Sequence, residues 1–162
     1  MNLKGKNAIV TGGGRGLGKA VALLLAKEGV NIGITGRNEE NLKSTVEELK
    51  GLGIQAFYSI FSMDEETAVQ NGIANLAKEL GGIDILINNA GIGDFGSIAE
   101  MPSETWEQVI KTNLFGVYYA AKAVYPFLKE KGEGDVVNVA STAGLKGGPN
   151  MSAYAASKAA VV

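Results

Sequence analysis

The sequence predicts a doubly wound α/β fold, in which a parallel sheet lies between two layers of helices as a three-layer α/β/α domain. Five short apolar runs alternate along the chain with longer stretches of helical periodicity, and this alternation is typical of a parallel sheet with right-handed crossovers. The runs at residues 83–87 and 136–139 are nearly continuously apolar, as in strands that are covered on both faces. A length of 162 residues suits one domain, residues 1–162.

Each predicted element occupies one segment of this alternation. The predicted strands are residues 7–11, 31–35, 55–60, 83–88 and 135–140. The predicted crossover helices are residues 16–27, 38–52, 64–80 and 103–130. Helix starts are indicated by capping residues ahead of an acidic first turn, at Asn38, Asp64 and Ser103. Helix ends are indicated by glycines suited to a left-handed conformation, at Gly29, Gly51, Gly53, Gly81 and Gly132.

The composition limits the chemistry that the chain can perform. It has no Cys and no His, which excludes disulfides, thiolate nucleophiles, His-metal sites and Ser-His-Asp triads, and we expect no metal site. The 15 Lys and Arg against 17 Asp and Glu give a net charge of −2, so nucleic acid is not an expected partner. No stretch approaches the roughly 20 apolar residues of a membrane span. We therefore expect a cytoplasmic protein that does not associate with membranes.

Glycines gather in the loops that follow strands, where folds of this class bind ligands. The 23 glycines exceed the roughly 11 expected from average usage, and clusters follow the first, fourth and fifth predicted strands. The cluster at residues 11–18 leads into a helix whose free N–H groups and dipole suit a phosphate. A tight turn that needs glycine only for left-handed dihedrals is the alternative.

Two common phosphate-binding patterns fit this loop imperfectly. Gly13, Gly18 and Lys19 match the P-loop pattern G-x-x-x-x-G-K, but Ala20 stands where Ser or Thr would coordinate magnesium. The dinucleotide pattern G-x-G-x-x-G fails at Leu17. The spacing present is T-G-x-x-x-G-x-G, and it resembles the N-terminal signature of the short-chain dehydrogenase/reductase family.

The segment after the second strand predicts which nucleotide the loop selects. In dinucleotide-binding folds an acid at this point holds the adenosine ribose 2′-hydroxyl, whereas an Arg accommodates a 2′-phosphate. No carboxylate is present here before Glu39, and Arg37 precedes a helix N-terminus, where a cation is disfavoured unless an anion lies nearby. Because Arg15 can approach the same phosphate, we expect NADP(H) rather than NAD(H). Two solvated surface arginines are the alternative.

A tyrosine and a lysine predict the proton chemistry. In a helix that begins near Ser152, Tyr154 and Lys158 lie at positions i and i+4 on one face. A free tyrosine has a pKa of about 10, and a neighbouring ammonium favours the phenolate and lowers that pKa. Ser141, at the end of the fifth predicted strand, is placed to bond a substrate oxygen beside the phenol.

Further motifs extend the family resemblance over practically the whole chain. They are N-N-A-G at residues 88–91, Asn113 within T-N-L, Ser141, and Y-x-x-x-K at Tyr154 and Lys158, in the order usual for the family. The resemblance implies a Rossmann-type fold and an NADPH-dependent carbonyl reductase similar to the 3-oxoacyl-(acyl carrier protein) reductases of fatty acid biosynthesis. The implied substrate is a 3-oxoacyl thioester or a similar ketone, either small or linked to an acyl carrier.

The same resemblance implies a role for each site residue. Tyr154 protonates the developing alkoxide, and Ser141 orients and polarises the carbonyl. Lys158 lowers the phenol pKa and binds the nicotinamide ribose, and Asn113 distorts its helix and connects Lys158 to a proton relay through a water. The implied cofactor-binding residues are Gly12, Gly14, Arg15, Gly16, Leu17, Gly18, Arg37, Asn89, Gly91, Tyr154 and Lys158. The sequence departs from the family at Phe61-Ser62, where Asp or Asn followed by Val usually touches the adenine, and neither residue is an expected contact.

Two expectations concern what surrounds the domain. The helix around Asn113 is apolar around most of its circumference, so it must be covered on more than one side. One side is the sheet, and the other cover is either a second subunit of a dimer or tetramer or the missing C-terminal part. The chain stops at Val162 within an apolar helix without a capping signal. We therefore expect a domain truncated within its catalytic helix, with its C-terminal part missing.

The alternative functions are a non-catalytic dinucleotide-binding module and, less favoured because of Ala20, a P-loop phosphotransferase.

Overall fold

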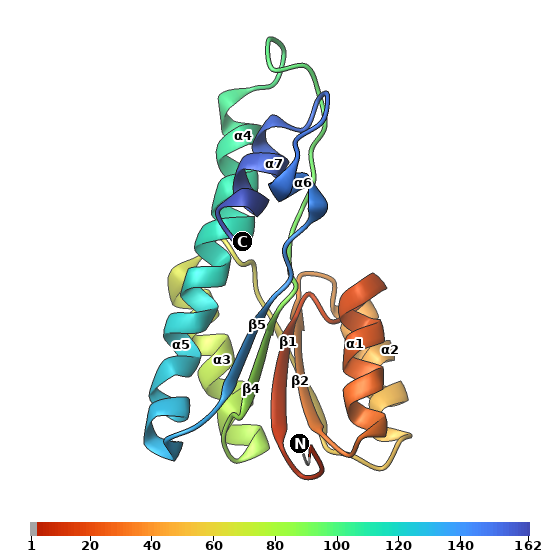
Figure 1. The fold of residues 1–162 in the computed structure, drawn as a ribbon. Helices are drawn as coiled ribbons and strands as arrows, with labels where there is room; N and C mark the ends of the chain where they lie inside the picture. Colours follow the sequence, from red (N-terminus) through yellow and green to blue (C-terminus); the bar gives the residue numbers. More distant parts are fainter. Residues whose placement is uncertain (1–2) are drawn as a thin grey trace.

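The computed structural model describes residues 3–162 and confirms the doubly wound α/β fold (Figure 1). Within these residues the sheet consists of five parallel strands in the order β3-β2-β1-β4-β5. The strands are β1 (Asn7–Thr11), β2 (Asn31–Gly36), β3 (Ala56–Ile60), β4 (Ile85–Asn88) and β5 (Asp135–Asn138). The winding reverses between β1 and β4, so the carboxyl ends of these two strands flank the crevice where such folds bind ligands.

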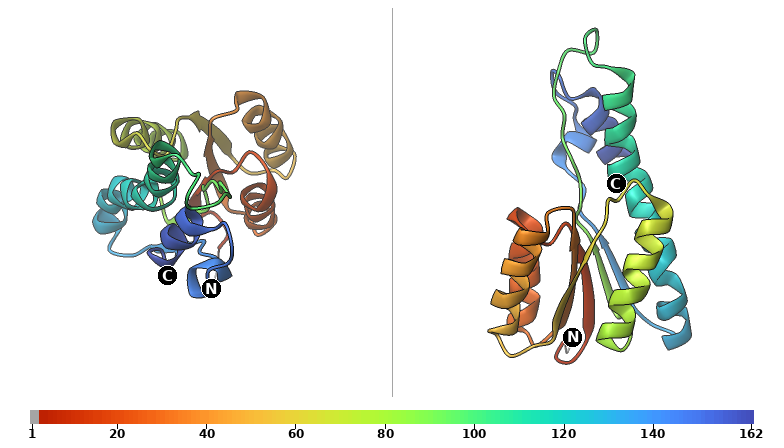
Figure 2. Two further views of the ribbon diagram at one scale, coloured as in Figure 1. Left: turned by 90° about the horizontal axis from the view of Figure 1, so that it is seen from above. Right: turned by 180° about the vertical axis from the view of Figure 1, so that it is seen from behind.

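Helices cover both faces of the sheet. On one face lie α1 (Gly16–Lys27) and α2 (Glu39–Lys50), and on the other lie α3 (Glu66–Leu80) and α5 (Gly116–Lys131) (Figure 2). Three further helices, α4 (Ser103–Ile110), α6 (Thr142–Leu145) and α7 (Ser152–Ala159), lie beyond the carboxyl ends of the strands (Figure 1). No helix within residues 3–162 is long and apolar enough to cross a membrane.

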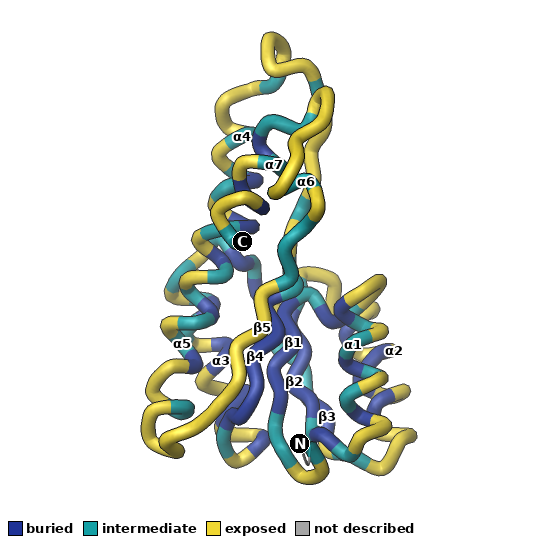
Figure 3. The backbone as a smooth tube through the Cα atoms, viewed as in Figure 1, coloured by how far each residue is buried: buried dark blue, intermediate teal, exposed yellow. Residues whose placement is uncertain are grey.

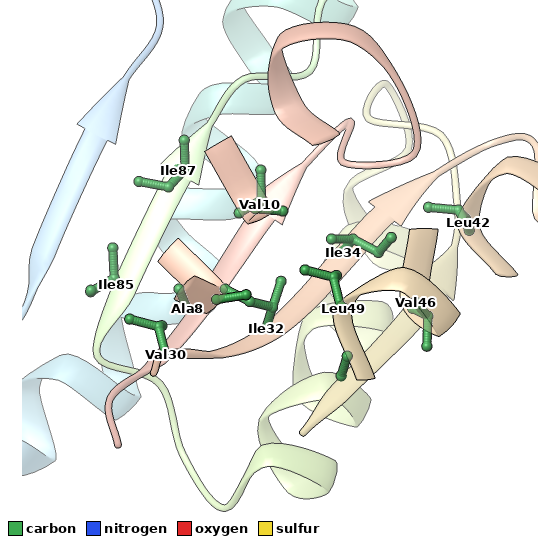
Figure 4. Packing of buried hydrophobic residues seen from close by; sticks show 13 residues of the cluster. Ala8, Val10, Val30, Ile32, Ile34, Leu42, Val46, Leu49, Ile85 and Ile87 are labelled. Carbon is green, nitrogen blue, oxygen red and sulfur yellow. The ribbon is translucent and has the colours of Figure 1, made fainter. Parts of the chain in front are cut away.

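Two apolar clusters, one on each face, hold the layers together. Successive side chains of a strand point to opposite faces, so Ala8 and Val10 of β1 pack with α1 and α2, whereas Ile9 packs with α3 and α5. Figure 4 shows the first cluster, in which Ile32 and Ile85 lie on the same side of the sheet as Val10. Each fully buried aliphatic side chain stabilises the fold by roughly 1.5–3 kcal/mol.

The prediction that β5 is covered on both faces is wrong. All four of its residues are exposed, with Val136 at 45% and Val137 at 48% of full exposure (Figure 3). β5 lies at an edge of the sheet, paired only with β4 in this chain, and no helix within residues 3–162 packs closely against its faces. The other edge strand, β3, is covered by α2 and α3 and is less exposed. By contrast, β4 lies between two strands and is entirely buried, as predicted. The boundaries of β3, β4 and β5 differ from the predicted ones by one or two residues.

The helix predicted at residues 103–130 is interrupted by a π-helical turn. This turn, η1 (Lys111–Phe115), joins α4 to α5 and contains Asn113 near its middle. The helix is therefore distorted at the residue where the family resemblance implies a distortion. Single π-turns inside α-helices are frequent at functional sites because they redirect side chains and backbone groups.

Of the three predicted helix caps, only Asn38 is confirmed. Its Oδ1 accepts the backbone N–H of Asn41 at 2.8 Å. The prediction for Asp64 is wrong, because α3 begins one residue later, after Glu65. The Asp64 carboxylate instead accepts a hydrogen bond from Nε2 of Gln108 at 2.7 Å, which ties the loop after β3 to α4.

Two other boundary predictions also need correction. Ser103 is the first residue of α4 and not its cap, which is Pro102 with a φ of −60°; proline suits the start of a helix because its φ is already close to the helical value. Gly51 has a right-handed φ of −59°. The other predicted terminal glycines do have the expected positive φ, namely Gly29, Gly53, Gly81 and Gly132.

Candidate active site

The loops that follow β1, β2, β3 and β4 enclose a cleft of about 340 Å³, a volume within the range of small-molecule sites. All the predicted cofactor contacts of the first loop lie along it, as do Arg37, Asn89 and Gly91. Residues that were not predicted also line it, namely Thr35, Gly36, Asn38, Leu42, Phe61, Ser62, Met63, Ala90, Ile92 and Thr112.

The glycines of the first loop bring three backbone segments together. Gly12 has a φ of +67°, and a Cβ there would lie 3.0 Å from the Cα of Ala90. A Cβ on Gly18 would lie 2.4 Å from both the carbonyl oxygen of Gly12 and Nδ2 of Asn89. Gly16 differs, because it has a φ of +55° and no atom within 4 Å of its Cβ position. The N-terminus of α1 therefore opens onto the cleft at Gly16, as a phosphate site requires.

Thr11 joins the loop after β1 to the loop after β4. Its Oγ1 accepts the backbone N–H groups of Asn89 and Ala90, each at 3.0 Å. In return, Nδ2 of Asn89 donates to the carbonyl oxygen of Thr11 at 3.0 Å. The Asn89 amide thus holds the wall of the cleft in place, in addition to lining it.

Arg15 and Arg37 line the cleft without an ion-pair partner. Within residues 3–162, no carboxylate oxygen lies within 4.0 Å of either guanidinium. The pKa of Asp64 is lowered, chiefly by hydrogen bonds from Ser62 and Gln108 and to a smaller extent by the charge of Arg37. The first turn of α1 also contains no acidic residue. This end of the cleft is accordingly built for an anion.

The cleft fits a dinucleotide phosphate better than a P-loop nucleotide. The hydroxyl of Thr35 is buried and has no hydrogen-bond partner within the described residues. Lys19, which would bind phosphate in a P-loop, forms an ion pair with Glu48 at 2.5 Å and does not line the cleft. The structure thus gives the P-loop alternative no support.

Asn113 connects the π-turn to two other segments. Its Oδ1 accepts the N–H of Ile92 at 2.8 Å, and its Nδ2 donates to the carbonyl oxygen of Ile92 at 2.9 Å and to Oγ of Ser157 at 3.0 Å. All three interactions are shielded, because Asn113 and Ser157 are fully buried. The expected link from Asn113 to Lys158 through a water stays a prediction.

Lys158 is buried behind the glycine that closes the cleft. Its Nζ donates to the carbonyl oxygen of Val139 at 2.7 Å, and a Cβ on Gly91 would lie 3.6 Å from the same Nζ. Burial lowers the pKa of Lys158, since a low-dielectric environment disfavours the ammonium. Tyr154 lies one helical turn earlier in α7, with its ring edge-on to Phe95 at a centroid distance of 5.7 Å.

Ser141 is held next to the same helix. It caps α6, where its Oγ accepts the N–H of Ala143 at 3.1 Å, and this leaves its hydroxyl hydrogen free to bond an acceptor. A Cβ on Gly144 would lie 2.6 Å from the carbonyl carbon of Lys158. The backbones of α6 and α7 are therefore in direct contact, which fixes Ser141 relative to the tyrosine and the lysine.

Comparison with known proteins agrees with this arrangement. A sequence profile described as short chain dehydrogenase matches residues 6–162. The chain belongs to the short-chain dehydrogenase family. It is 36% identical over 162 residues to a 3-oxoacyl-(acyl-carrier-protein) reductase of Thermotoga maritima and covers 66% of that protein. It is 34% identical over 160 residues to a gluconate 5-dehydrogenase of Gluconobacter oxydans and covers 62% of it.

Solved short-chain dehydrogenase structures share the fold. A xylitol dehydrogenase with bound NAD⁺ superimposes with a TM-score of 0.95 at 36% identity, over 99% of this chain and 62% of that one. A variant of actinorhodin polyketide ketoreductase with NADPH gives a TM-score of 0.92 at 35% identity, over 96% of this chain and 60% of that one. The chain thus spans about two thirds, or slightly less, of the length of the relatives it matches.

Sequence reasoning missed several residues that shape this short-chain dehydrogenase site. Thr11 and Ser157 hold the glycine loop and α7 in place, and Thr35 and Thr112 line the cleft. Thr11 is the first residue of the T-G-x-x-x-G-x-G signature, but the signature did not predict that its hydroxyl joins the loops after β1 and β4. No local signal marks Ser157, because its partner Asn113 is 44 positions away in the sequence.

Proposed function

We propose that this chain carries the cofactor cleft and the proton-transfer residues of an NADPH-dependent carbonyl reductase. The observation that carries the cofactor assignment is that Arg15 and Arg37 line one cleft and form no ion pair within residues 3–162. Arg is suited to bind a 2′-phosphate, which NADP has and NAD lacks. Gly16 at the open N-terminus of α1 is where we place the pyrophosphate.

The proposed catalytic residues, Tyr154, Ser141 and Lys158, do not line the cleft themselves; they lie on α7 and at the start of α6, with Lys158 next to Gly91 of the cleft wall. Bound NADPH supplies the hydride that reduces the carbonyl carbon. Tyr154 gives its hydroxyl proton to the carbonyl oxygen and is reprotonated from solvent, while Ser141 donates a hydrogen bond to the same oxygen. Lys158 keeps a buried ammonium beside Gly91 on the cleft wall, where it favours the phenolate that proton transfer leaves behind. The products are an alcohol and NADP⁺.

The proposed substrate is a 3-oxoacyl thioester or a similar ketone. The support is that one relative is named as a 3-oxoacyl-(acyl-carrier-protein) reductase and another as a polyketide ketoreductase. An acyl carrier protein is then a partner that delivers the substrate.

We also propose that the protein is a homo-oligomer, because aromatic side chains of η1 and α5 remain exposed, with Phe115 at 44%, Tyr118 at 54% and Tyr125 at 60% of full exposure.

Turnover of a ketone with NADPH tests this function. We expect protein purified from its native gene to oxidise NADPH when acetoacetyl thioester is added, which absorbance at 340 nm reports. Tyr154→Phe should lower kcat by about 10²-fold or more, the range of general acid catalysis, while NADPH binding survives. NADPH binding without turnover of any ketone would instead favour the non-catalytic dinucleotide-binding module.

A further inference from the structure

The hydroxyl of Ser157 in α7 bridges two groups inside the protein. The residue is fully buried. Its Oγ donates a hydrogen bond to the carbonyl oxygen of Tyr154 at 2.8 Å and accepts one from Nδ2 of Asn113 at 3.0 Å. The first bond is local to the helix and is common for serine. The second reaches across 44 positions of the sequence to the π-turn η1, so it fixes α7 relative to another element.

The direction of this bridge is set by the backbone of Ile92. Asn113 accepts the N–H of Ile92 through Oδ1 at 2.8 Å and donates to the carbonyl oxygen of Ile92 through Nδ2 at 2.9 Å. A backbone N–H can only donate and a carbonyl can only accept, so the Asn113 amide has one orientation. The second hydrogen on Nδ2 then needs an acceptor, which the Ser157 hydroxyl provides. A continuous chain of hydrogen bonds therefore runs from the loop after β4 through η1 to α7.

This chain of bonds ends at the residues proposed for proton transfer. Ser157 directly precedes Lys158 in a helix of 8 residues that also contains Tyr154. A helix this short is not stable by itself, so its position depends on its packing against α4, α6 and η1 (Figure 1). At the cleft wall, a Cβ on Gly91 would lie 3.2 Å from Oδ1 of Asn113 and 3.6 Å from Nζ of Lys158. The bridge thus holds the catalytic helix against the wall of the cofactor cleft.

We propose that Ser157 is a positioning residue, which holds Tyr154 and Lys158 in place relative to the cofactor cleft by joining α7 to Asn113. The inference rests on the proposed function and adds a residue outside the motifs that indicated that function. Ser157 acts through its two partners and not on the substrate, because its hydroxyl is buried between them. A misplacement of reacting groups by about 1 Å can lower a rate by about 10²-fold, so the effect is measurable in the reaction itself.

The rate of a single turnover tests this role. Protein purified from its native gene, at a concentration that saturates NADPH, is mixed with excess acetoacetyl thioester, and the loss of NADPH fluorescence gives a rate constant. We expect Ser157→Ala to lower this rate constant by about fivefold or more. Partial unfolding alone would not lower it, provided that the folded protein still saturates the NADPH. A smaller decrease overturns the inference.

Matched variants separate the hydroxyl of Ser157 from its shape. Ser157→Thr keeps the hydroxyl, whereas Ser157→Val has nearly the same shape without it, so the threonine variant should react faster by about fivefold or more. Equal rate constants for these two variants would contradict the bridge. If the added methyl group prevents folding, the alanine variant alone decides.

A second serine of α7 provides the control for position. The Oγ of Ser152 is buried without a hydrogen-bond partner within residues 3–162, so Ser152→Ala should keep the wild-type rate constant. An equal loss in Ser152→Ala and Ser157→Ala would count against a specific role of Ser157. Wild-type protein that binds NADPH but reduces no ketone overturns the proposed function and this inference with it. Wild-type turnover with an unaffected Ser157→Ala variant overturns the inference alone.

Discussion

At the scale of single residues, the site is marked by two kinds of residue. Some polar side chains have no bonding partner within the described chain, and some glycines stand where no larger side chain fits. Arg37 is a cation with no ion-pair partner within the described chain, and Thr35 is a buried hydroxyl with no hydrogen bond there. Gly18 sits where any side chain would collide with backbone. Unpaired polar groups lower the stability of the fold, and close backbone contacts limit a position to glycine. Proteins keep such features mainly at functional sites, so they are expected where a ligand is bound.

Removal of the Arg37 charge should change the choice of cofactor. We expect Arg37→Ala to raise the Kd for NADPH by roughly tenfold or more, because a charge-assisted hydrogen bond to phosphate is lost, and to leave the Kd for NADH nearly unchanged. Fluorescence titration with both nucleotides measures this. Lys43→Ala is a matched control, because Lys43 is an exposed cation of α2 that pairs with Glu39 outside the cleft. An equal loss of affinity for NADPH and NADH would count against a 2′-phosphate site at Arg37.

A single methyl group at Gly18 should disturb the loop. The Cβ of Gly18→Ala would meet a carbonyl oxygen and an amide nitrogen at 2.4 Å, so the backbone must shift. We expect unfolding in urea to show a loss of about 1–3 kcal/mol, together with weaker NADPH binding. Gly96→Ala, where nothing lies within 4 Å of the new atom, should stay within about 0.5 kcal/mol of wild type. Equal stability of the two variants would contradict the close approach at Gly18.

At the scale of elements, buried polar contacts fix the ends of strands and helices. Asp84 precedes β4, and its carboxylate accepts the backbone N–H of Asn7 at 2.8 Å and a hydrogen bond from Nζ of Lys131. Burial alone would raise the pKa of Asp84, but the bonds from Lys131 and Asn7 outweigh it and the pKa is lowered. One carboxylate therefore joins β1, β4 and the end of α5. This contact lies at the amino-terminal ends of the strands, whereas the cleft lies at their carboxyl ends.

The depressed pKa of Asp84 predicts a pH-dependent contribution to stability. The ionised carboxylate stabilises the folded state fully above the unfolded pKa, and that stabilisation is lost as the pH falls through the lower folded pKa. We expect Asp84→Asn to lower the free energy of unfolding at neutral pH by about 1–3 kcal/mol. The difference from wild type should shrink at about pH 3 and below. Urea unfolding at both pH values measures it, and a difference that does not depend on pH would contradict the ionised state.

The elements also show what a sequence can and cannot predict. Apolar runs and their alternation predicted all five strands and the crossover helices, because local patterning determines whether a segment forms a strand or a helix. The exposure of β5 was predicted wrongly, because the coverage of a strand depends on the helices that pack against its faces and not on the residues of the strand itself. The contacts of Asn113 and Ser157 join segments distant in sequence, so no local pattern could reveal them.

At the scale of the whole molecule, one helical layer keeps an uncovered aromatic face. Phe115, Tyr118 and Tyr125 are exposed on η1 and α5, and the ring of Phe115 stacks on that of Tyr119. Exposed aromatic side chains grouped on one helical segment commonly mark an interface between proteins. A second copy of the chain is the cover that we propose for it.

A charge placed on this face should separate the subunits. We expect Phe115→Asp to lower the mass measured by analytical ultracentrifugation to that of a monomer, because a carboxylate buried at an interface without a partner is strongly unfavourable. Leu24→Asp is the control, because Leu24 is an exposed apolar residue of α1 on the other layer, at 62% of full exposure against 44% for Phe115. A wild-type protein that is already monomeric, or a Phe115→Asp variant with unchanged mass, would contradict the proposed interface.

The transfer of hydride from the cofactor with a proton from Tyr154 is most directly tested with a labelled nucleotide. NADPH carrying deuterium at both positions on C4 of the nicotinamide is mixed with the protein and an acetoacetyl thioester, and the product is analysed by mass spectrometry. We expect a hydroxyacyl thioester with deuterium on the carbinol carbon, formed at a rate that Tyr154→Phe lowers by about 10²-fold or more. Absence of the deuterated alcohol with the wild-type protein, or its formation at the wild-type rate by Tyr154→Phe, would contradict the account.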